Sequence, residues 1–281
     1  MSVEVKLVPD VWGSMVRTRS ISILVVLLVV LAGCLGGGSD APPAGGGGSD
    51  GGDGGVNDGG SEDSGDDLDV VDSEAALREA GSFTTAWTFT MVDAEGNETT
   101  MSNRFAVDLV ANRTSEILSV TGETGVSYER FTADGQSYTR YGDGEQTFYQ
   151  VTPVQDDPVA SALSRGAAVS YDDFEDARRV GTETFDGVTV DRYEYTDRTL
   201  WRQYGAGTFG TERNVTVQDF TVVTLVDGDG LARSTGWTVV GETDAGETVT
   251  AEWRFDLTGL GSTAVADPDW LAEAQSANPS G

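Results

Sequence analysis

The sequence contains no histidine, and Lys6 is its only lysine. Without histidine, the usual base of a serine-type catalytic triad and the histidine-ligated zinc sites are excluded. Without a lysine after a glycine-rich loop, the phosphate-binding loop of nucleotide hydrolases is excluded as well. Carboxylate chemistry remains, but among 47 acidic residues no acid pair stands out. We therefore predict a protein that is not an enzyme and that holds no cofactor and no metal.

The chain also has only one cysteine, Cys34, so it cannot form an internal disulfide. Cys34 follows Leu-Ala-Gly at the end of an apolar stretch, residues 21–32, with Arg17 and Arg19 ahead of it. The stretch is shorter than the roughly 20 apolar residues of a membrane-spanning helix. The arrangement resembles the lipobox of a prokaryotic lipoprotein signal, in which the cysteine takes up lipid and becomes the new N-terminus.

This pattern divides the chain into three parts. Residues 1–33 are predicted to be a signal peptide, with residues 1–14 as a mis-assigned extension before Met15. Residues 34–71 comprise the lipidated Cys34 and a tether of glycine, serine and aspartate, which has too few apolar residues to fold. Residues 72–281 form one β-rich extracytoplasmic domain. The predicted location is the extracytoplasmic face of the cell membrane, reached by an export route that the sequence leaves open. The alternative is an N-terminal anchor that is never cleaved.

Basic residues are scarce: 17 stand against 47 acidic ones, for a net charge of −30. Such a chain repels itself in dilute buffer, whereas at molar salt the Debye length falls to about 3 Å. We therefore interpret the chain as a halophilic, archaeal protein; the alternative is an acidic calcium-binding surface protein. The charge argues against binding to nucleic acid and against docking on anionic lipid.

Short segments with apolar and polar residues in alternation predict a long series of antiparallel strands. They are separated by turns with glycine, of which Asp186-Gly187 is the strongest hairpin signal. The segment 220–226 is apolar on both faces, which predicts a strand buried on both sides near the middle of the sheet. The predicted strands are 83–91, 99–109, 114–120, 126–132, 137–141, 147–151, 180–185, 188–195, 215–226, 231–242 and 247–257.

Three helices accompany these strands. The first covers residues 74–80, capped by Asp72 or Ser73, and the second covers 159–168, with Asp157 as cap and Pro158 in its first turn. A third is predicted at 267–271 from a second Asp-Pro pair. The predicted fold class is mostly β (α+β): a long antiparallel meander curled into a half-barrel, with one inserted helix and short terminal helices.

The order of these elements, with the late hairpin at 226–233, resembles the lipoprotein carrier superfamily of LolA and LppX type. The segments 77–82 and 267–270 are similar to an uncharacterised family of haloarchaeal surface lipoproteins. The resemblance covers about residues 72–277. It implies a half-barrel whose apolar concavity holds acyl chains in relatives, although a lipid-anchored archaeal protein has no outer membrane to which lipoproteins could be carried.

Two functions follow as alternatives. The domain binds a lipid or other apolar ligand in the concavity of its sheet, or it is an envelope interaction or structural module with a filled core. An apolar pocket of about 300 Å³ or more would separate the first from the second. Partners of the second kind would be surface-layer or envelope proteins. The predicted cavity residues, chosen from apolar faces and from an aromatic segment beside glycines, are Trp87, Phe89, Leu163, Trp201, Tyr204, Trp237 and Trp253.

The sequence contains two further kinds of motif. The acidic segments 171–176 and 227–230 are interpreted first as a solvated loop and a hairpin turn, and only second as calcium sites, because they lack the order of a calcium-binding loop. Three Asn-x-Thr sequons, at Asn97, Asn112 and Asn214, stand at or near predicted turns and predict N-glycosylation.

Overall fold

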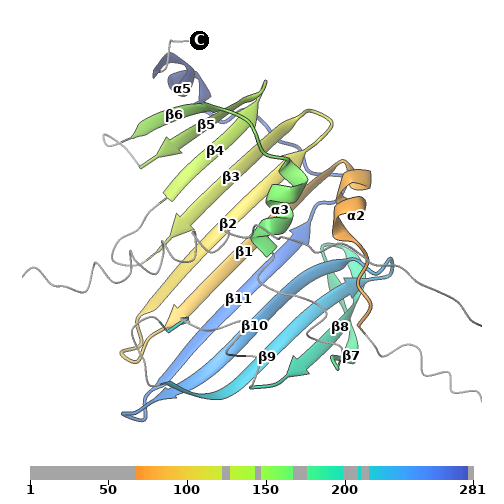
Figure 1. Ribbon diagram of the computed structural model, residues 1–281, viewed down its shortest axis with the longest axis vertical. Coiled ribbons are helices and arrows are strands. Elements are labelled where there is room, and N and C mark those ends of the chain that lie inside the picture. Colours follow the sequence, from red (N-terminus) through yellow and green to blue (C-terminus); the bar gives the residue numbers. More distant parts are fainter. Residues whose placement is uncertain are drawn as a thin grey trace, which may run out of the picture. The chain divides into compact units, whose positions relative to one another are not determined.

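The domain is built on one open, antiparallel sheet of eleven strands (Figure 1). The computed structural model describes residues 68–121, 127–142, 147–166, 176–198, 201, 208–209 and 215–277. All of them belong to the compact unit 37–281. The predicted fold class, mostly β with a curled antiparallel sheet, is confirmed.

The strands lie within a few residues of their predicted bounds. The first six are β1 (Ser82–Val92), β2 (Glu98–Asp108), β3 (Arg113–Val120), β4 (Ser127–Ala133), β5 (Gln136–Tyr141) and β6 (Phe148–Pro153). The other five are β7 (Arg178–Phe185), β8 (Val188–Thr196), β9 (Val215–Asp227), β10 (Ala232–Thr243) and β11 (Thr248–Thr258).

The strand order shows two meanders joined side by side. It runs β6-β5-β4-β3-β2-β1-β11-β10-β9-β8-β7. The first strand therefore pairs with the last one, with Phe89 opposite Trp253. The consecutive strands β6 and β7 stand at opposite edges of the sheet, which is why the sheet stays open.

Tight turns join neighbouring strands where the sequence predicted them. Asp186 and Gly187 have φ values of 48° and 79°, and Asp134 and Gly135 have 51° and 74°. Positive φ at both central residues is the geometry whose twist matches that of a two-residue hairpin. Glycine and aspartate tolerate it better than most residues, which explains why Asp-Gly pairs occupy these positions.

Two of the three predicted helices begin as expected. In α2 (Ser73–Ala80), the Asp72 carboxylate accepts a hydrogen bond from Glu74 N at 2.9 Å. In α3 (Pro158–Gly166), Asp157 Oδ1 accepts from Val159 N and Ala160 N, each at 2.9 Å. These bonds satisfy backbone donors that a helix start leaves free.

The third helix is misplaced in the prediction. The structure has no helix at 267–270; α5 instead spans Leu271–Ala277. Asp267 does not act as its cap, because α5 begins four residues later; its carboxylate pairs with Arg113 at 2.8 Å. The segment Pro268–Trp270 forms a turn in which Pro268 O accepts a hydrogen bond from Leu271 N.

The helices cover both faces of the sheet. Leu77 of α2 and Val159 of α3 pack with Phe83 and Phe105, whereas Trp270 and Ala274 pack with Ala106 and Phe131. Because alternate residues of a strand point to opposite faces, Phe105 and Ala106 mark the two sides. We call the first side, with α2 and α3, the α3 face, and the second the α5 face (Figure 1).

The segment 220–226, predicted to be buried on both sides, lies in β9 and is buried on both sides only along part of its length. In β9, Thr224, Leu225 and Val226 are buried at successive positions, but Thr221 and Val223 are partly exposed. The strand is also third from the β7 edge rather than near the middle. Among the described residues, no helix is long and apolar enough to cross a membrane.

Candidate ligand-binding face

The α3 face carries an apolar surface contributed by four adjacent strands. Phe89 of β1 is opposite Trp253 of β11, Trp253 is opposite Trp237 of β10, and Trp237 is opposite Val222 of β9. Residues paired across antiparallel strands lie on the same face. The register therefore aligns these side chains into one row across the sheet, and Trp87 and Phe255 form part of the neighbouring row.

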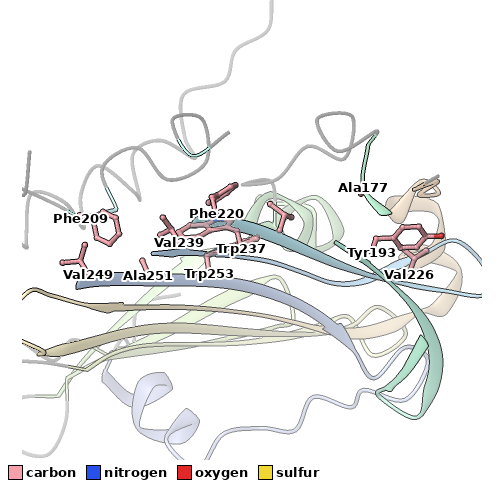
Figure 2. Close-up of a cluster of buried hydrophobic side chains, with 11 residues drawn as sticks. Ala177, Tyr193, Phe209, Phe220, Val226, Trp237, Val239, Val249, Ala251 and Trp253 are labelled. Atoms are coloured by element: carbon pink, nitrogen blue, oxygen red, sulfur yellow. The ribbon is translucent and has the colours of Figure 1, made fainter. Parts of the chain in front are cut away.

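The buried members of this surface, among them Phe220, Trp237 and Trp253, form one hydrophobic cluster (Figure 2). The ring centroids of Phe89 and Trp237 lie 6.2 Å apart, edge to face, and those of Phe220 and Trp237 lie 6.1 Å apart. Trp253 and Phe255 stack at 6.4 Å. Spacings and angles of this kind are favourable for aromatic pairs.

Trp201 brings a second aromatic group to the same cluster. Its ring lies 5.3 Å from that of Phe209 and 6.3 Å from that of Phe220. Leu68 and Val70, at the end of the segment that the sequence assigned to the tether, also pack against this cluster.

Five of the seven predicted cavity residues meet here: Trp87, Phe89, Trp201, Trp237 and Trp253. Leu163, on α3, packs against the neighbouring cluster around Leu77 and Phe105. Tyr204 lies outside the described residues. The sequence thus identified side chains that the fold brings together, and their role as a cavity stays a prediction.

The side chains of this aromatic surface differ in how far they are buried. Trp237, Val239 and Val249 are buried, whereas Trp87, Phe89 and Phe255 are only partly buried. Trp237 is 5% exposed, and its indole Nε1 makes no hydrogen bond with a described residue. Because a buried tryptophan N–H ordinarily has an acceptor, this donor is unusual.

A polar group lies at the other end of the α3 face, around Glu116 of β3. The Glu116 side chain is 4% exposed and pairs with Arg165 of α3 at 2.8 Å and with Arg130 of β4 at 3.2 Å. Asn103 of β2 donates to it through Nδ2 at 2.9 Å. Arg165 also donates to Ser161 O within its own helix.

This group adjoins the apolar surface directly. Asn103 is opposite Trp87 in the register of β1 and β2. The Arg165 guanidinium lies 4.2 Å from the ring centroid of Phe105, a cation–π distance. The α3 face therefore combines an aromatic surface over β1, β11, β10 and β9 with a buried ionic group over β2, β3 and β4.

The electrostatics keep Glu116 charged. Burial would raise the pKa of its carboxyl, but attraction to Arg165, the hydrogen bonds from Arg165 and Asn103, and attraction to Arg130 together lower it below its ordinary value. Burial, followed by the negative charge of Glu116, raises the pKa of the Tyr128 hydroxyl. Tyr128 is therefore neutral at physiological pH.

Sequence reasoning missed this polar group. A signal was present: Glu116 occupies an alternate position with Leu118 and Val120, where an apolar residue is expected. In a chain with so many acidic residues, however, a single glutamate at an apolar position does not stand out from the composition. Its partners Asn103, Arg130 and Arg165 come from three other elements, and no local pattern links them.

The remaining predicted sites lie elsewhere. Cys34, Asn214 and the acidic segment 171–176 up to residue 175 are outside the described residues, whereas Asn97 and Asn112 are exposed beside turns. The segment 227–230 is a hairpin turn, since Asp227 Oδ1 accepts from Asp229 N and Leu231 N. Within the described part of the chain, no group of three or more Asp, Glu, His or Cys side chains could hold a metal ion.

Comparison with known proteins gives a family match. The sequence pattern of a family described as a family of unknown function (DUF7537) matches residues 19–274. No curated protein matches the sequence.

Comparison with solved structures gives low-scoring similarities. LprF from Mycobacterium bovis has 11% identity and a TM-score of 0.33, over 70% of this chain and 96% of that one. The LolA superfamily protein NE2245 from Nitrosomonas europaea has 12% identity and a TM-score of 0.18, over 72% and 97% of the two chains. The ywiB protein from Bacillus subtilis has 8% identity and a TM-score of 0.16, over 63% and 91%. Similarities at these scores have no bearing on the ligand of this chain.

Proposed function

The chain belongs to the family of unknown function DUF7537, and we propose that it is a membrane-anchored extracytoplasmic lipoprotein whose α3 face binds a lipid or another apolar ligand. The aromatic surface of the α3 face carries this proposal. Trp87, Phe89, Trp237 and Trp253 come from three adjacent strands and lie on one side of the sheet. Two of the four, Trp87 and Phe89, are only partly buried.

Large aromatic side chains on a regular sheet supply apolar contact area, and each tryptophan adds a single polar atom, its indole N–H donor. Such surfaces are typical of sites for small apolar molecules, which place a few polar groups among hydrophobic ones. The Trp237 Nε1 donor, buried and unpartnered among the described residues, fits this pattern. An acceptor atom of a ligand would satisfy it.

The anchor in this proposal is a lipid on Cys34, which follows the apolar stretch 21–32. Catalysis is not part of the proposal. The chain has no histidine, and its single cysteine is assigned to the anchor. A partner in the surface layer or the envelope belongs to the alternative, in which the face is a filled core and the exterior carries the function.

Mass spectrometry of the full chain, extracted from the membrane of a producing archaeal cell, tests the proposal. Under denaturing conditions, the expected mass is that of a chain beginning at a lipidated Cys34. Under native conditions, an additional mass that organic solvent releases as lipid is expected. An unprocessed chain would contradict the anchor, and a folded chain without any releasable mass would favour the envelope module.

Two variants of β1 locate the ligand. Phe89→Arg places a charge on the α3 face and is expected to abolish the releasable mass, because a chain of methylenes cannot solvate a guanidinium. Thr88→Arg, its neighbour on the opposite and exposed face, is the matched control and is expected to retain the mass. Equal loss from both variants would argue against binding on the α3 face.

A further inference from the structure

The ionic group around Glu116 differs in charge from the other ion pairs of the domain. Among ion pairs between described residues, Glu116 is the only carboxylate shared by two arginines, Arg130 and Arg165. In the other ion pairs between described residues, the carboxylates equal or outnumber the arginines, as where Asp186 and Asp227 both pair with Arg233. The Glu116 group therefore carries one excess positive charge, within a chain of net charge −30.

Arg130 is the member of this group that can reach a ligand. It donates through Nη1 to Glu116 at 3.2 Å and through Nε to Thr139 Oγ1 at 3.3 Å, and its guanidinium lies over the ring of Tyr128. Its Nη2 has no hydrogen bond to a described residue, and its side chain is 39% exposed. Guanidinium donors are well suited to carboxylate and phosphate oxygens.

Asn103 provides a second, independent observation. Asn103 is 4% exposed, and its Nδ2 is bound to Glu116, so its amide lies within the group. Its Oδ1 is buried and accepts no hydrogen bond from a described residue. A buried acceptor without a donor is destabilising. A hydroxyl on a ligand headgroup would satisfy it.

We propose that the Glu116 group is the headgroup site for an anionic amphiphile. A phosphate or carboxylate binds Arg130, a neighbouring hydroxyl donates to Asn103 Oδ1, and the apolar chain extends past Trp87 onto the aromatic surface. This inference rests on the proposed function, which it deepens by assigning the ligand a negative charge. At long range the acidic chain repels such a ligand, so its selection depends on the local excess of arginine.

The test compares decyl phosphate, decanol and inorganic phosphate as probes of the full chain, with binding followed by tryptophan fluorescence. Decyl phosphate is expected to bind about tenfold more tightly than decanol, since hydrogen bonds to charged groups are stronger than neutral ones. Inorganic phosphate alone is expected to bind more weakly than decyl phosphate, because it lacks the chain.

Two substitutions assign the difference to Arg130. Arg130→Gln is expected to remove the tenfold preference for decyl phosphate over decanol, and Arg130→Lys, which keeps the charge, is expected to restore part of it. Arg140→Gln is the control, because Arg140 lies on the neighbouring strand, on the opposite face, and pairs with Glu129. Thermal melting of each variant checks that it folds.

The outcomes separate the two proposals. If decanol and decyl phosphate bind the wild-type chain equally, the headgroup site is wrong, whereas the apolar surface stands. If neither amphiphile binds, the proposed function fails and the headgroup site fails with it. If inorganic phosphate binds as tightly as decyl phosphate, the site recognises a free anion and not an amphiphile. The comparison of the wild-type chain with the three probes holds even if Arg130→Gln does not fold.

Discussion

At the scale of single residues, Glu116 is the buried charge that links the elements at one end of the α3 face. Its carboxylate binds two arginines and one amide from three different elements. Removing a member of a buried ionic group leaves the others desolvated without compensation, which costs more than the net contribution of the group. Glu116 therefore connects β2, β4 and α3 through one side chain.

We expect Glu116→Gln to lower the free energy of unfolding at neutral pH by about 3 kcal/mol, because Arg165 and Arg130 lose their buried counter-charge. The pKa of Glu116 is lowered in the folded state, so the stabilisation is complete above the ordinary value of 4.5 and disappears as the pH falls through the folded value. Denaturant unfolding of both proteins at several pH values should show that the difference between their free energies of unfolding becomes smaller in acid.

Glu183→Gln is a suitable control, because Glu183 is exposed and lies 3.7 Å from Arg192. An exposed pair contributes about 0–1 kcal/mol, so this variant should unfold much like the wild type. If the difference in the free energy of unfolding between wild type and Glu116→Gln stays constant down to acid pH, Glu116 does not act as a buried counter-charge.

Arg233 is a second buried residue whose hydrogen-bond partners come from distant parts of the sequence. Its guanidinium donates to Asp227, Asp186 and the Leu257 carbonyl, at 3.2, 3.2 and 3.3 Å. The sequence identified Asp186 and Asp227 as turn residues, which is a local property. That the same carboxylates hold a buried arginine depends on the pairing of β8, β9, β10 and β11.

At the scale of elements, the contact between β10 and β11 depends on Gly236. A Cβ atom at this position would lie 2.7 Å from the backbone oxygen of Trp253. Since that oxygen belongs to the neighbouring strand, the two strands would have to separate. The same pair of strands presents Trp237 and Trp253 to the α3 face.

Gly236→Ala is therefore expected to destabilise the domain by about 1–3 kcal/mol, the usual cost of forcing extra volume into a packed site. Gly181→Ala in β7 is the comparison, because a Cβ there meets no atom within 4 Å. Urea unfolding of the two variants measures the difference. Equal stabilities would show that β10 and β11 can shift apart at little cost.

Helix starts show why local elements were predictable. Asp157 caps α3 through its own side chain and the two following amides, so all the participating atoms lie within four residues. The Asp-Pro pair at 267–268 has the same local pattern, but Arg113 takes the Asp267 carboxylate. The helix α5 begins only at Leu271, so the Asp-Pro pattern by itself does not decide where a helix starts.

At the scale of the whole molecule, net charge sets the response to salt. A net charge of −30 at pH 7 destabilises a compact state through self-repulsion. The melting temperature of the full chain should therefore rise steeply between low salt and molar potassium chloride, as the Debye length falls from about 10 Å at 0.1 M to about 3 Å at 1 M. Thermal scans at increasing salt measure it.

Sucrose at matched osmolality is the control for this experiment, because it is excluded from protein surfaces but does not screen charge. A rise of the same size in sucrose would attribute the effect to solvent exclusion. A melting temperature that does not change with salt would show that the acidic side chains are too far apart to repel one another.

The sequence by itself determined the strands, the Asp-Gly hairpins, the first two helices and the apolar face that holds Trp87, Phe89, Trp237 and Trp253. Each of these depends on a periodicity of two or on contacts within a few residues, which a sequence displays directly. Only the tertiary structure decided that β1 pairs with β11, that β6 and β7 stand at opposite edges, and that Glu116 meets Arg130, Arg165 and Asn103. These contacts join segments far apart in the chain, and their free energy comes from burying surfaces and charges that no local pattern connects.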